Sequence, residues 1–218
     1  MFIDGTIGWV IDGIVVLIIL FLFYVLSMVW PPDSPWAPWW QMPKDVIRKM
    51  YKMVGLKSSD VVYELGCGIA DAMVIARNEF GAKAIGIEID PLRIFLARIN
   101  VWKANHMKPS IQFEPSFWGA KRRQNQIRKD PGPARMTTNK ITIIKDNFFN
   151  IDLSDATVLI IYLVPKALGR LSPKFIKELK KGTRIVSYKY TFPKEVSLKK
   201  IKLVKEDKKN EIYFYEIA

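Results

Sequence analysis

The longest apolar run of the chain lies near its N-terminus, and shorter apolar runs separated by polar breaks follow it. Residues 13–30 hold no charged side chain and consist mostly of Ile, Val, Leu and Phe. As a helix, this segment is about 27 Å long, close to the hydrocarbon thickness of a bilayer, and it has no polar face. The pattern predicts a transmembrane helix rather than a buried core helix.

Charged residues around this run predict its orientation. Residues 1–40 contain three aspartates and no Lys or Arg, so the basic region that opens a signal peptide is missing. Lys44, Arg48, Lys49 and Lys52 follow directly. The positive-inside rule therefore predicts a single-pass protein of the cell membrane, with its N-terminus outside and the rest of the chain in the cytoplasm.

The composition changes on both sides of residue 40. Four tryptophans and four prolines lie between residues 30 and 40, which is typical of an interfacial aromatic belt and a stiff tether. We therefore divide the chain into an anchor, 1–40, and a domain, 41–218. All 34 Lys and Arg belong to the domain, and the net charge is +13. This balance favours an anionic membrane surface as partner, and nucleic acid is the competing interpretation.

Beyond residue 40, short β-branched runs alternate with segments of helical periodicity. The predicted strands are 61–65, 84–89, 141–145, 157–164, 184–192, 199–205 and 211–217, and the predicted helices are 43–54, 72–80, 91–104 and one that starts at Ser172-Pro173 and stops at Gly182. In the helix 91–104 we expect Ile94, Ala97, Val101 and Trp102 to face the core. Residues 109–139, rich in basic residues and proline, predict an insertion that is mostly loop.

This alternation predicts an α/β fold. Strands that alternate with helices pair in parallel, and the two last strands, joined by a polar turn, form an antiparallel hairpin. We expect a Rossmann-like, seven-stranded, mostly parallel sheet with an antiparallel C-terminal hairpin, preceded by one N-terminal transmembrane helix. Seven strands in this order fit the class I methyltransferase architecture.

Candidate chemistry lies at the end of the first predicted strand. Glu64 is followed by Gly66 and Gly68, and a helix begins soon after, so bare backbone N–H groups face a ligand. A dinucleotide fingerprint needs a third glycine where Asp71 stands, and an acid there repels a pyrophosphate. An acid-x-Gly-x-Gly pattern suits S-adenosylmethionine (SAM), which carries an ammonium and a sulfonium and no phosphate.

Four further residues complete the predicted cofactor site. Glu88 ends the second strand at the spacing of an acid that binds ribose hydroxyls. Asn147 follows the third strand and suits the adenine amino group, and Phe148 suits the adenine ring. Cys67, between the two glycines, is expected to fill the tight turn rather than act as a nucleophile. As the only cysteine, it excludes internal disulfides and a cysteine metal cluster, and we predict no metal site.

Several motifs together resemble a known family. They are Val-Tyr-Glu-Leu-Gly-Cys-Gly at 62–68, Gly-Ile-Glu-Ile-Asp-Pro at 86–91, Asn-Phe-Phe at 147–149, Tyr-Leu-Val-Pro at 162–165 and Glu-Leu-Lys-Lys-Gly-Thr-Arg-Ile-Val-Ser at 178–187. On these motifs, residues 43–192 resemble the seven-strand protein-lysine methyltransferases. That group includes archaeal broad-specificity enzymes and the membrane-anchored mitochondrial enzymes that modify the ATP synthase c subunit and the adenine nucleotide translocase.

The resemblance implies direct methyl transfer from SAM to a lysine ε-amine of a membrane-associated protein. It places the amine slot at Tyr162 and Pro165, where the fourth strand ends. Family members usually carry Asp-Gly after the second glycine, whereas this chain has Ile69 and Ala70, so Asp71 is the candidate to replace the acid. Two alternatives stay open: a methyltransferase for RNA or a small molecule, and a non-catalytic membrane scaffold with a degenerate SAM site.

Overall fold

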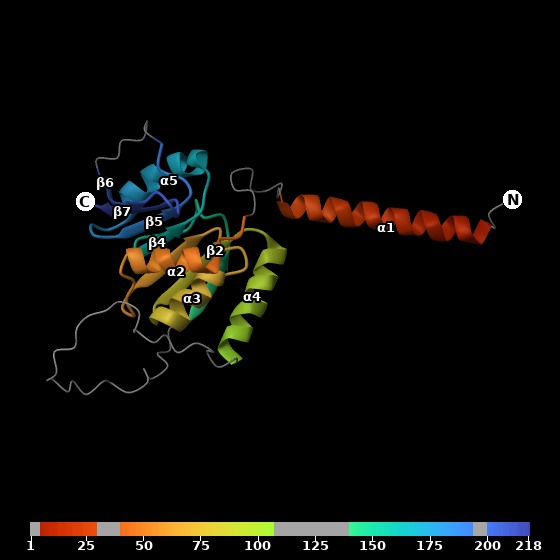
Figure 1. Ribbon diagram of the computed structural model, residues 1–218, viewed down its shortest axis with the longest axis horizontal. Coiled ribbons are helices and arrows are strands. Elements are labelled where there is room, and N and C mark those ends of the chain that lie inside the picture. Colours follow the sequence, from red (N-terminus) through yellow and green to blue (C-terminus); the bar gives the residue numbers. More distant parts are fainter. Residues whose placement is uncertain (1–4, 30–39, 107–139, 194–199) are drawn as a thin grey trace.

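The body of the molecule is built on one seven-stranded sheet in the order β3-β2-β1-β4-β5-β7-β6 (Figure 1). The computed structural model describes residues 5–29, 40–106, 140–193 and 200–218. The first five strands in this order are parallel, and β7 is antiparallel to both β5 and β6. The predicted Rossmann-like fold is confirmed, including the antiparallel C-terminal hairpin.

The described residues form seven strands and five helices. The strands are β1 (Val61–Leu65), β2 (Lys83–Glu88), β3 (Ile141–Lys145), β4 (Val158–Ile161), β5 (Arg184–Tyr188), β6 (Ile201–Asp207) and β7 (Ile212–Ile217). The helices are α1 (Gly5–Val29), α2 (Lys44–Met53), α3 (Asp71–Phe80), α4 (Pro91–His106) and α5 (Pro165–Glu178). The expected insertion, 109–139, lies outside the described residues, as do Trp30, Trp36 and Trp39 of the expected aromatic belt.

Helices cover both faces of the sheet, because the central strands are apolar on both sides. On one face, α2, α3 and α4 pack over alternate strand residues that include Val62, Ala84 and Ile160. On the other face, α5 packs over the intervening residues, among them Leu159 and Ile185. This layering leaves the carboxyl ends of the parallel strands as the edge where a ligand site is expected.

The helix after β4 starts earlier than the sequence predicts. We expected it to begin at Ser172-Pro173, but α5 begins at Pro165 and carries Pro173 inside. Pro165 is well placed at the first helical position, where a missing N–H costs nothing. The hydroxyl of Ser172 donates a hydrogen bond to the carbonyl of Leu168 (2.7 Å) instead of capping a new helix. The buried side chains of Leu168 and its neighbours in the first turns hold this segment against the sheet.

A second expectation was wrong at the residue level. Ile94 and Ala97 are buried and Val101 packs against the core, as predicted, but Trp102 is 59% exposed. Its position on α4 is about 80° from Ile94 around the helix axis at 3.6 residues per turn. Trp102 therefore belongs to the outer side of α4.

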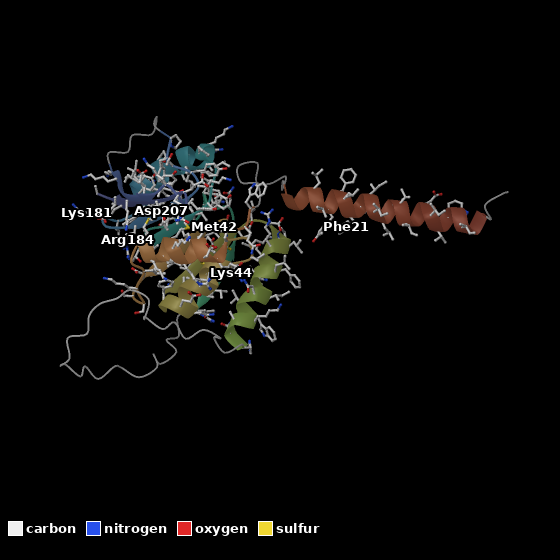
Figure 2. The ribbon with its side chains drawn as sticks, viewed as in Figure 1. Phe21, Met42, Lys44, Lys181, Arg184 and Asp207 are labelled. Atoms are coloured by element: carbon white, nitrogen blue, oxygen red, sulfur yellow. The ribbon has the colours of Figure 1, made fainter. Side chains whose placement is uncertain are left out.

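α1 is a candidate membrane span. Residues Ile7–Leu26 have a mean hydropathy of 2.8, and none of this segment is buried inside the structure. Figure 2 shows side chains such as Phe21 projecting from α1 with no other described helix or strand against them. By length and composition, one helix of the described residues is thus able to cross a membrane, although a signal sequence passes the same test.

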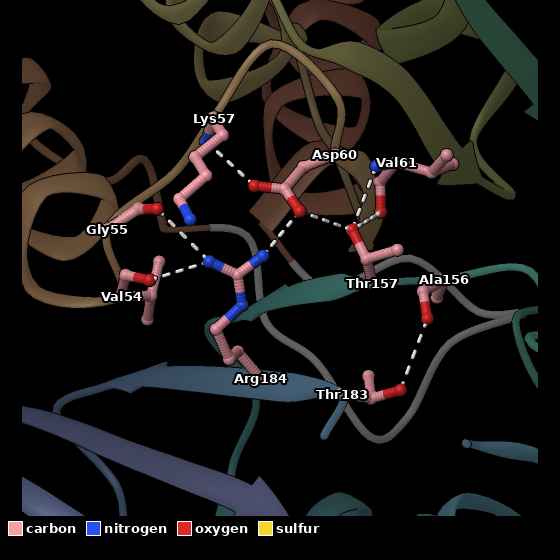
Figure 3. Close-up of polar contacts among 9 residues, drawn as sticks. All are labelled: Val54, Gly55, Lys57, Asp60, Val61, Ala156, Thr157, Thr183 and Arg184. Carbon is pink, nitrogen blue, oxygen red and sulfur yellow. Dashed lines mark hydrogen bonds and ion pairs between the residues drawn. The ribbon is translucent and has the colours of Figure 1, made fainter. Parts of the chain in front are cut away.

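The amino ends of the strands are tied together by a polar network (Figure 3). Arg184, which opens β5, forms an ion pair with the buried carboxylate of Asp60 and donates hydrogen bonds to the carbonyls of Val54 (2.8 Å) and Gly55 (3.1 Å). The hydroxyl of Thr157 also donates to Asp60 (2.9 Å). These contacts join the end of α2 to β1, β4 and β5 at the edge opposite the expected site.

Candidate functional site

A glycine loop follows β1 at the carboxyl edge of the sheet. Gly66, Gly68 and Ala70 all adopt left-handed backbone conformations, with φ of 79°, 52° and 64°. The backbone N–H groups of Gly66 and Cys67 both donate to the carbonyl of Ile87 at 2.9 Å. The loop is therefore fixed against the end of β2, and glycine is the residue that reaches these conformations without strain.

Ala70 occupies one of these left-handed positions with a side chain. The residue is fully buried, and its methyl group lies within the core beneath α2 and α3. A left-handed conformation costs a non-glycine residue roughly 1–2 kcal/mol. Ala70 thus keeps the left-handed turn that leads into α3 although it carries a side chain.

Glu88 connects the glycine loop to the start of α4. Its Oε2 accepts a hydrogen bond from the N–H of Gly68 (2.9 Å), and its Oε1 accepts from the N–H groups of Ile89 (2.9 Å) and Asp90 (3.0 Å). The side chain is only 4% exposed. Each carboxylate oxygen has two lone-pair sites, so Oε1 is fully used and Oε2 keeps capacity to accept from a ribose hydroxyl.

Glu64, on β1, is a buried carboxyl group with an unsatisfied oxygen atom among the described residues. It is 5% exposed, and within the described part of the chain its Oε2 has no hydrogen-bond partner. Burial raises the pKa of Glu64 well above its usual value, and the nearby charges of Asp71 and Glu88 raise it further. A buried acceptor without a partner destabilises the fold, so this oxygen is suited to a cationic ligand group.

Asp71 is held by side chains from α2, from α4 and from the segment that precedes α2. Its Oδ2 accepts from the Gln41 side-chain amide (2.7 Å), and its Oδ1 accepts from that of Asn100 (3.0 Å) and pairs with the Lys44 ammonium at 3.3 Å. Asn100 also donates to the carbonyl of Ile69 (2.9 Å). Asp71 therefore fixes the exit of the glycine loop against α4 and the start of α2, and its part in binding SAM stays a prediction.

The loop after β3 lies beside Glu88. The N–H of Asp146 donates to the Glu88 carbonyl (3.2 Å), and the Asn147 side-chain oxygen accepts from the N–H of Phe149 (3.1 Å). Phe148 is buried, and its ring centroid is 5.0 Å from that of Phe149. The structure thus brings Asn147 and Phe148 to the same edge of the sheet as Glu88.

Three tyrosines gather where β4 and β5 end. The ring of Tyr162 lies 4.9 Å from that of Tyr188 and 6.2 Å from that of Tyr190, the latter nearly parallel. The pairing of Leu65 with Ile161 places Tyr162 next to Gly66. Burial, and then the neighbouring tyrosines and Glu211, raise the pKa of Tyr162, so its hydroxyl stays protonated at neutral pH.

Sequence reasoning missed Tyr188 and Tyr190, because it extended the fifth strand to residue 192. β5 ends at Tyr188, and Lys189 turns the chain with a φ of 68°. The Ser187 hydroxyl donates to the Tyr190 carbonyl (2.6 Å), and the Tyr190 N–H donates to the Tyr188 carbonyl (2.8 Å). This tight turn sets both rings beside Tyr162.

The two remaining predicted site residues are Pro165 and Cys67. Pro165 is exposed at the first position of α5, two residues beyond Leu163, which packs near Gly66. Cys67 is buried, and burial raises the pKa of its thiol well above the usual value. A protonated, buried thiol is a poor nucleophile, which supports the expected space-filling role.

Comparison with known proteins identifies the family. A sequence model of the ANTKMT methyltransferase domain matches residues 108–199. A protein-lysine N-methyltransferase of Saccharolobus islandicus is 31% identical over 196 residues, which are 88% of this chain and 98% of the relative. The chain belongs to the protein-lysine N-methyltransferase family. It is a SAM-dependent methyltransferase, as the sequence motifs predicted.

Solved structures support the fold. An RNA methyltransferase of Salinibacter ruber, in complex with S-adenosyl-L-homocysteine, superposes with a TM-score of 0.61 at 23% identity, covering 82% of this chain and 94% of that one. A precorrin-6y C5,15-methyltransferase of Geobacter metallireducens gives a TM-score of 0.51 at 15% identity, covering 88% and 97%. At such identities the likeness shows the shared architecture alone.

The residues at the carboxyl edge fit SAM. The Oε2 of Glu64 has no hydrogen-bond partner among the described residues, and SAM has an ammonium at its methionine end that suits it as a donor. Gly66 and Gly68 carry no side chain at the turn, and Glu88 lies beyond them with acceptor capacity left. Glu64 would hold the methionine end of SAM, Gly66 and Gly68 would let the cofactor lie against the backbone, and Glu88 would hold the ribose.

Proposed function

We propose that this protein transfers a methyl group from SAM to the ε-amine of a lysine in a membrane-associated protein. The observation that carries the lysine assignment is the 31% identity to a protein-lysine N-methyltransferase over 98% of that relative. When bound, SAM supplies an electrophilic methyl group on a sulfonium. The chain's own residues have to present an uncharged amine to it.

The tyrosine group is the proposed amine slot. Tyr162, Tyr188 and Tyr190 offer ring faces beside the glycine loop, and ring faces suit both the methylene chain and the cationic form of lysine. An enclosure of this kind lowers the pKa of an amine by desolvation, which favours the attacking free base. Holding the nitrogen in line supplies much of the rate. Pro165 borders the slot in this proposal.

The proposed location is a membrane, with α1 as a single-pass anchor. The absence of basic residues before residue 40 and the cluster after residue 43 support an N-terminus outside and a cytoplasmic domain. Protease added to sealed vesicles of known orientation tests this. A body cleaved only in vesicles whose cytoplasmic face is outward agrees with it, and the reverse pattern contradicts it.

The central experiment follows methyl transfer directly. The full chain in nanodiscs is incubated with membranes and SAM that carries an isotopically labelled methyl group. We expect label on lysines of membrane proteins and none with Glu88→Ala. Label in RNA, lost steeply with salt, would instead support the nucleic-acid alternative, and no SAM binding by the folded chain would support a scaffold.

Substitution of Tyr162 distinguishes a role in methyl transfer from a role in SAM binding in the same assay. Tyr162→Ala is expected to retain SAM binding but to lower the transfer rate by about 100-fold, because the amine loses its position. Tyr162→Phe keeps the ring and is the matched control. Transfer by Tyr162→Ala at the wild-type rate would contradict the proposed slot.

A further inference from the structure

The outer side of α4 presents aromatic side chains to solvent. Phe95 and Trp102 are each 59% exposed, and Ile99 between them is half-buried. Their spacing puts the three on one side of the helix, while Ile94 and Ala97 face the core. The Trp102 ring contacts that of His106, with centroids 4.7 Å apart.

Basic residues flank this stripe. Arg98 and Lys103 are both exposed, and α4 contains no Asp or Glu that would neutralise their charge. Within the described chain outside α1, the exposed large apolar residues are Trp40, Phe95, Trp102, Leu203 and Val204. The three aromatic ones thus lie on α4 or at the point where the chain enters the body.

That point of entry is fixed beside α4. Gln41 and Asn100 of α4 bind the two oxygens of the same Asp71 carboxylate, at 2.7 and 3.0 Å. Figure 2 labels Met42 and Lys44, which follow Gln41, and Met42 is buried. Residues 30–39 connect the end of α1 to this point, and ten residues span at most about 35 Å. A membrane that holds α1 therefore lies within reach of α4.

We propose that the face formed by Phe95, Ile99 and Trp102, with Arg98 and Lys103, docks onto an anionic bilayer surface. Aromatic rings favour the headgroup region, and basic side chains are attracted to an anionic leaflet. The inference rests on the proposed role of α1 as an anchor. Because α4 begins three residues after Glu88, docking holds the cofactor edge at the level of the membrane surface.

Site-specific fluorescence tests the docking. Phe95→Cys, Trp102→Cys and the control Lys181→Cys are made in the full chain, where buried Cys67 stays unlabelled, and carry an environment-sensitive dye. Lys181 is exposed and precedes β5 at the opposite edge of the sheet. The chains are reconstituted into phosphatidylcholine vesicles with and without phosphatidylglycerol, and lipids with a spin label near the headgroup serve as quenchers.

We expect several-fold stronger quenching at 95 and 102 than at 181 in anionic vesicles, and a loss of this difference with Arg98→Glu and Lys103→Glu together. Equal quenching at all three sites, in chains that float with vesicles, overturns the docking. A dye that reports an apolar environment but is not quenched by the spin-labelled lipids also overturns the docking, since a protein segment then covers the face. Failure to float refutes the anchor as well. The lysine assignment is tested separately, because this readout measures lipid contact and not methyl transfer.

Discussion

At the scale of single residues, Glu64 and Trp102 both depart from the usual distribution of polar and apolar groups. Glu64 is a carboxyl group buried with one oxygen unpartnered, and Trp102 is a large apolar ring that is mostly exposed. Neither arrangement stabilises the isolated chain, because an unsatisfied buried polar atom and an exposed apolar surface both cost free energy. For each we propose a partner outside the chain: the ammonium of SAM for Glu64 and a lipid surface for Trp102.

Glu64→Gln is expected to stabilise the protein without SAM while weakening SAM binding. The folded pKa of Glu64 is raised, so the folded state is penalised as pH rises above the unfolded pKa and is not penalised below about pH 4. Gln removes that penalty, so its advantage in unfolding free energy, about 1–3 kcal/mol, appears at neutral pH and vanishes in acid. Denaturant titrations across this pH range measure it.

The same variant loses a charge opposite the SAM ammonium, and its affinity should fall by about tenfold. Glu216→Gln, at an exposed position of β7, is the control and should change neither quantity. A Glu64→Gln protein that binds SAM as tightly as wild type would remove Glu64 from the methionine end.

Gly86 is expected to tolerate no side chain. A Cβ at this position would lie 2.7 Å from the Sγ and 2.8 Å from the Cβ of Cys67. Gly86→Ala should therefore push the glycine loop out of place, at a cost of about 1–3 kcal/mol in unfolding free energy and a loss of SAM affinity. Calorimetric titration and thermal unfolding measure both. Gly182→Ala, where a Cβ meets no atom of the described residues within 4 Å but φ is 83°, controls for backbone effects without overpacking.

At the scale of elements, the two edges of the sheet have different tasks. The carboxyl edge holds the glycine loop, the acids and the tyrosines, which we propose to contact the cofactor and the amine. The amino edge holds Arg184 and Asp60, which connect α2, β1 and β5 through contacts within the chain. Stability and function are thus separated along the strand direction, so substitutions at the amino edge should change stability alone.

Arg184→Ala tests this separation. It leaves the buried Asp60 carboxylate without its cation and removes the donors to Val54 and Gly55, so we expect a loss of about 3 kcal/mol in unfolding free energy. SAM affinity, measured where the variant is folded, should stay close to wild type. Lys202→Ala, on the exposed side of β6, is the control with the same charge change. A selective loss of SAM affinity with little loss of stability would contradict the separation.

At the scale of the whole molecule, a cofactor that bridges β1, β2 and β3 should stabilise the entire domain. Ligand at 100-fold excess over its Kd contributes about 2.7 kcal/mol, which for a chain of this size raises Tm by about 5–10 °C. We expect this shift with SAM in detergent-solubilised wild-type protein and no shift in Glu88→Ala. An equal shift in both would show that Glu88 does not hold the ribose.

The sequence by itself determined the features that depend on neighbouring residues. The β-branched run at 61–65, the left-handed turns at Gly66 and Gly68, the acid spacing to Glu88 and the apolar span all follow from local propensity and period. The order of strands and helices then fixed the fold class, since only a few topologies accommodate it.

Only the tertiary structure decided the features that depend on residues far apart in the chain. Asp71 was predicted for SAM, yet its contacts come from Gln41 and Asn100, about thirty residues away on either side. Tyr188 and Tyr190 meet Tyr162 because β5 stops short and turns at Lys189, which strand propensity does not encode. Local sequence sets backbone conformation, whereas the partner of each side chain depends on how the layers pack.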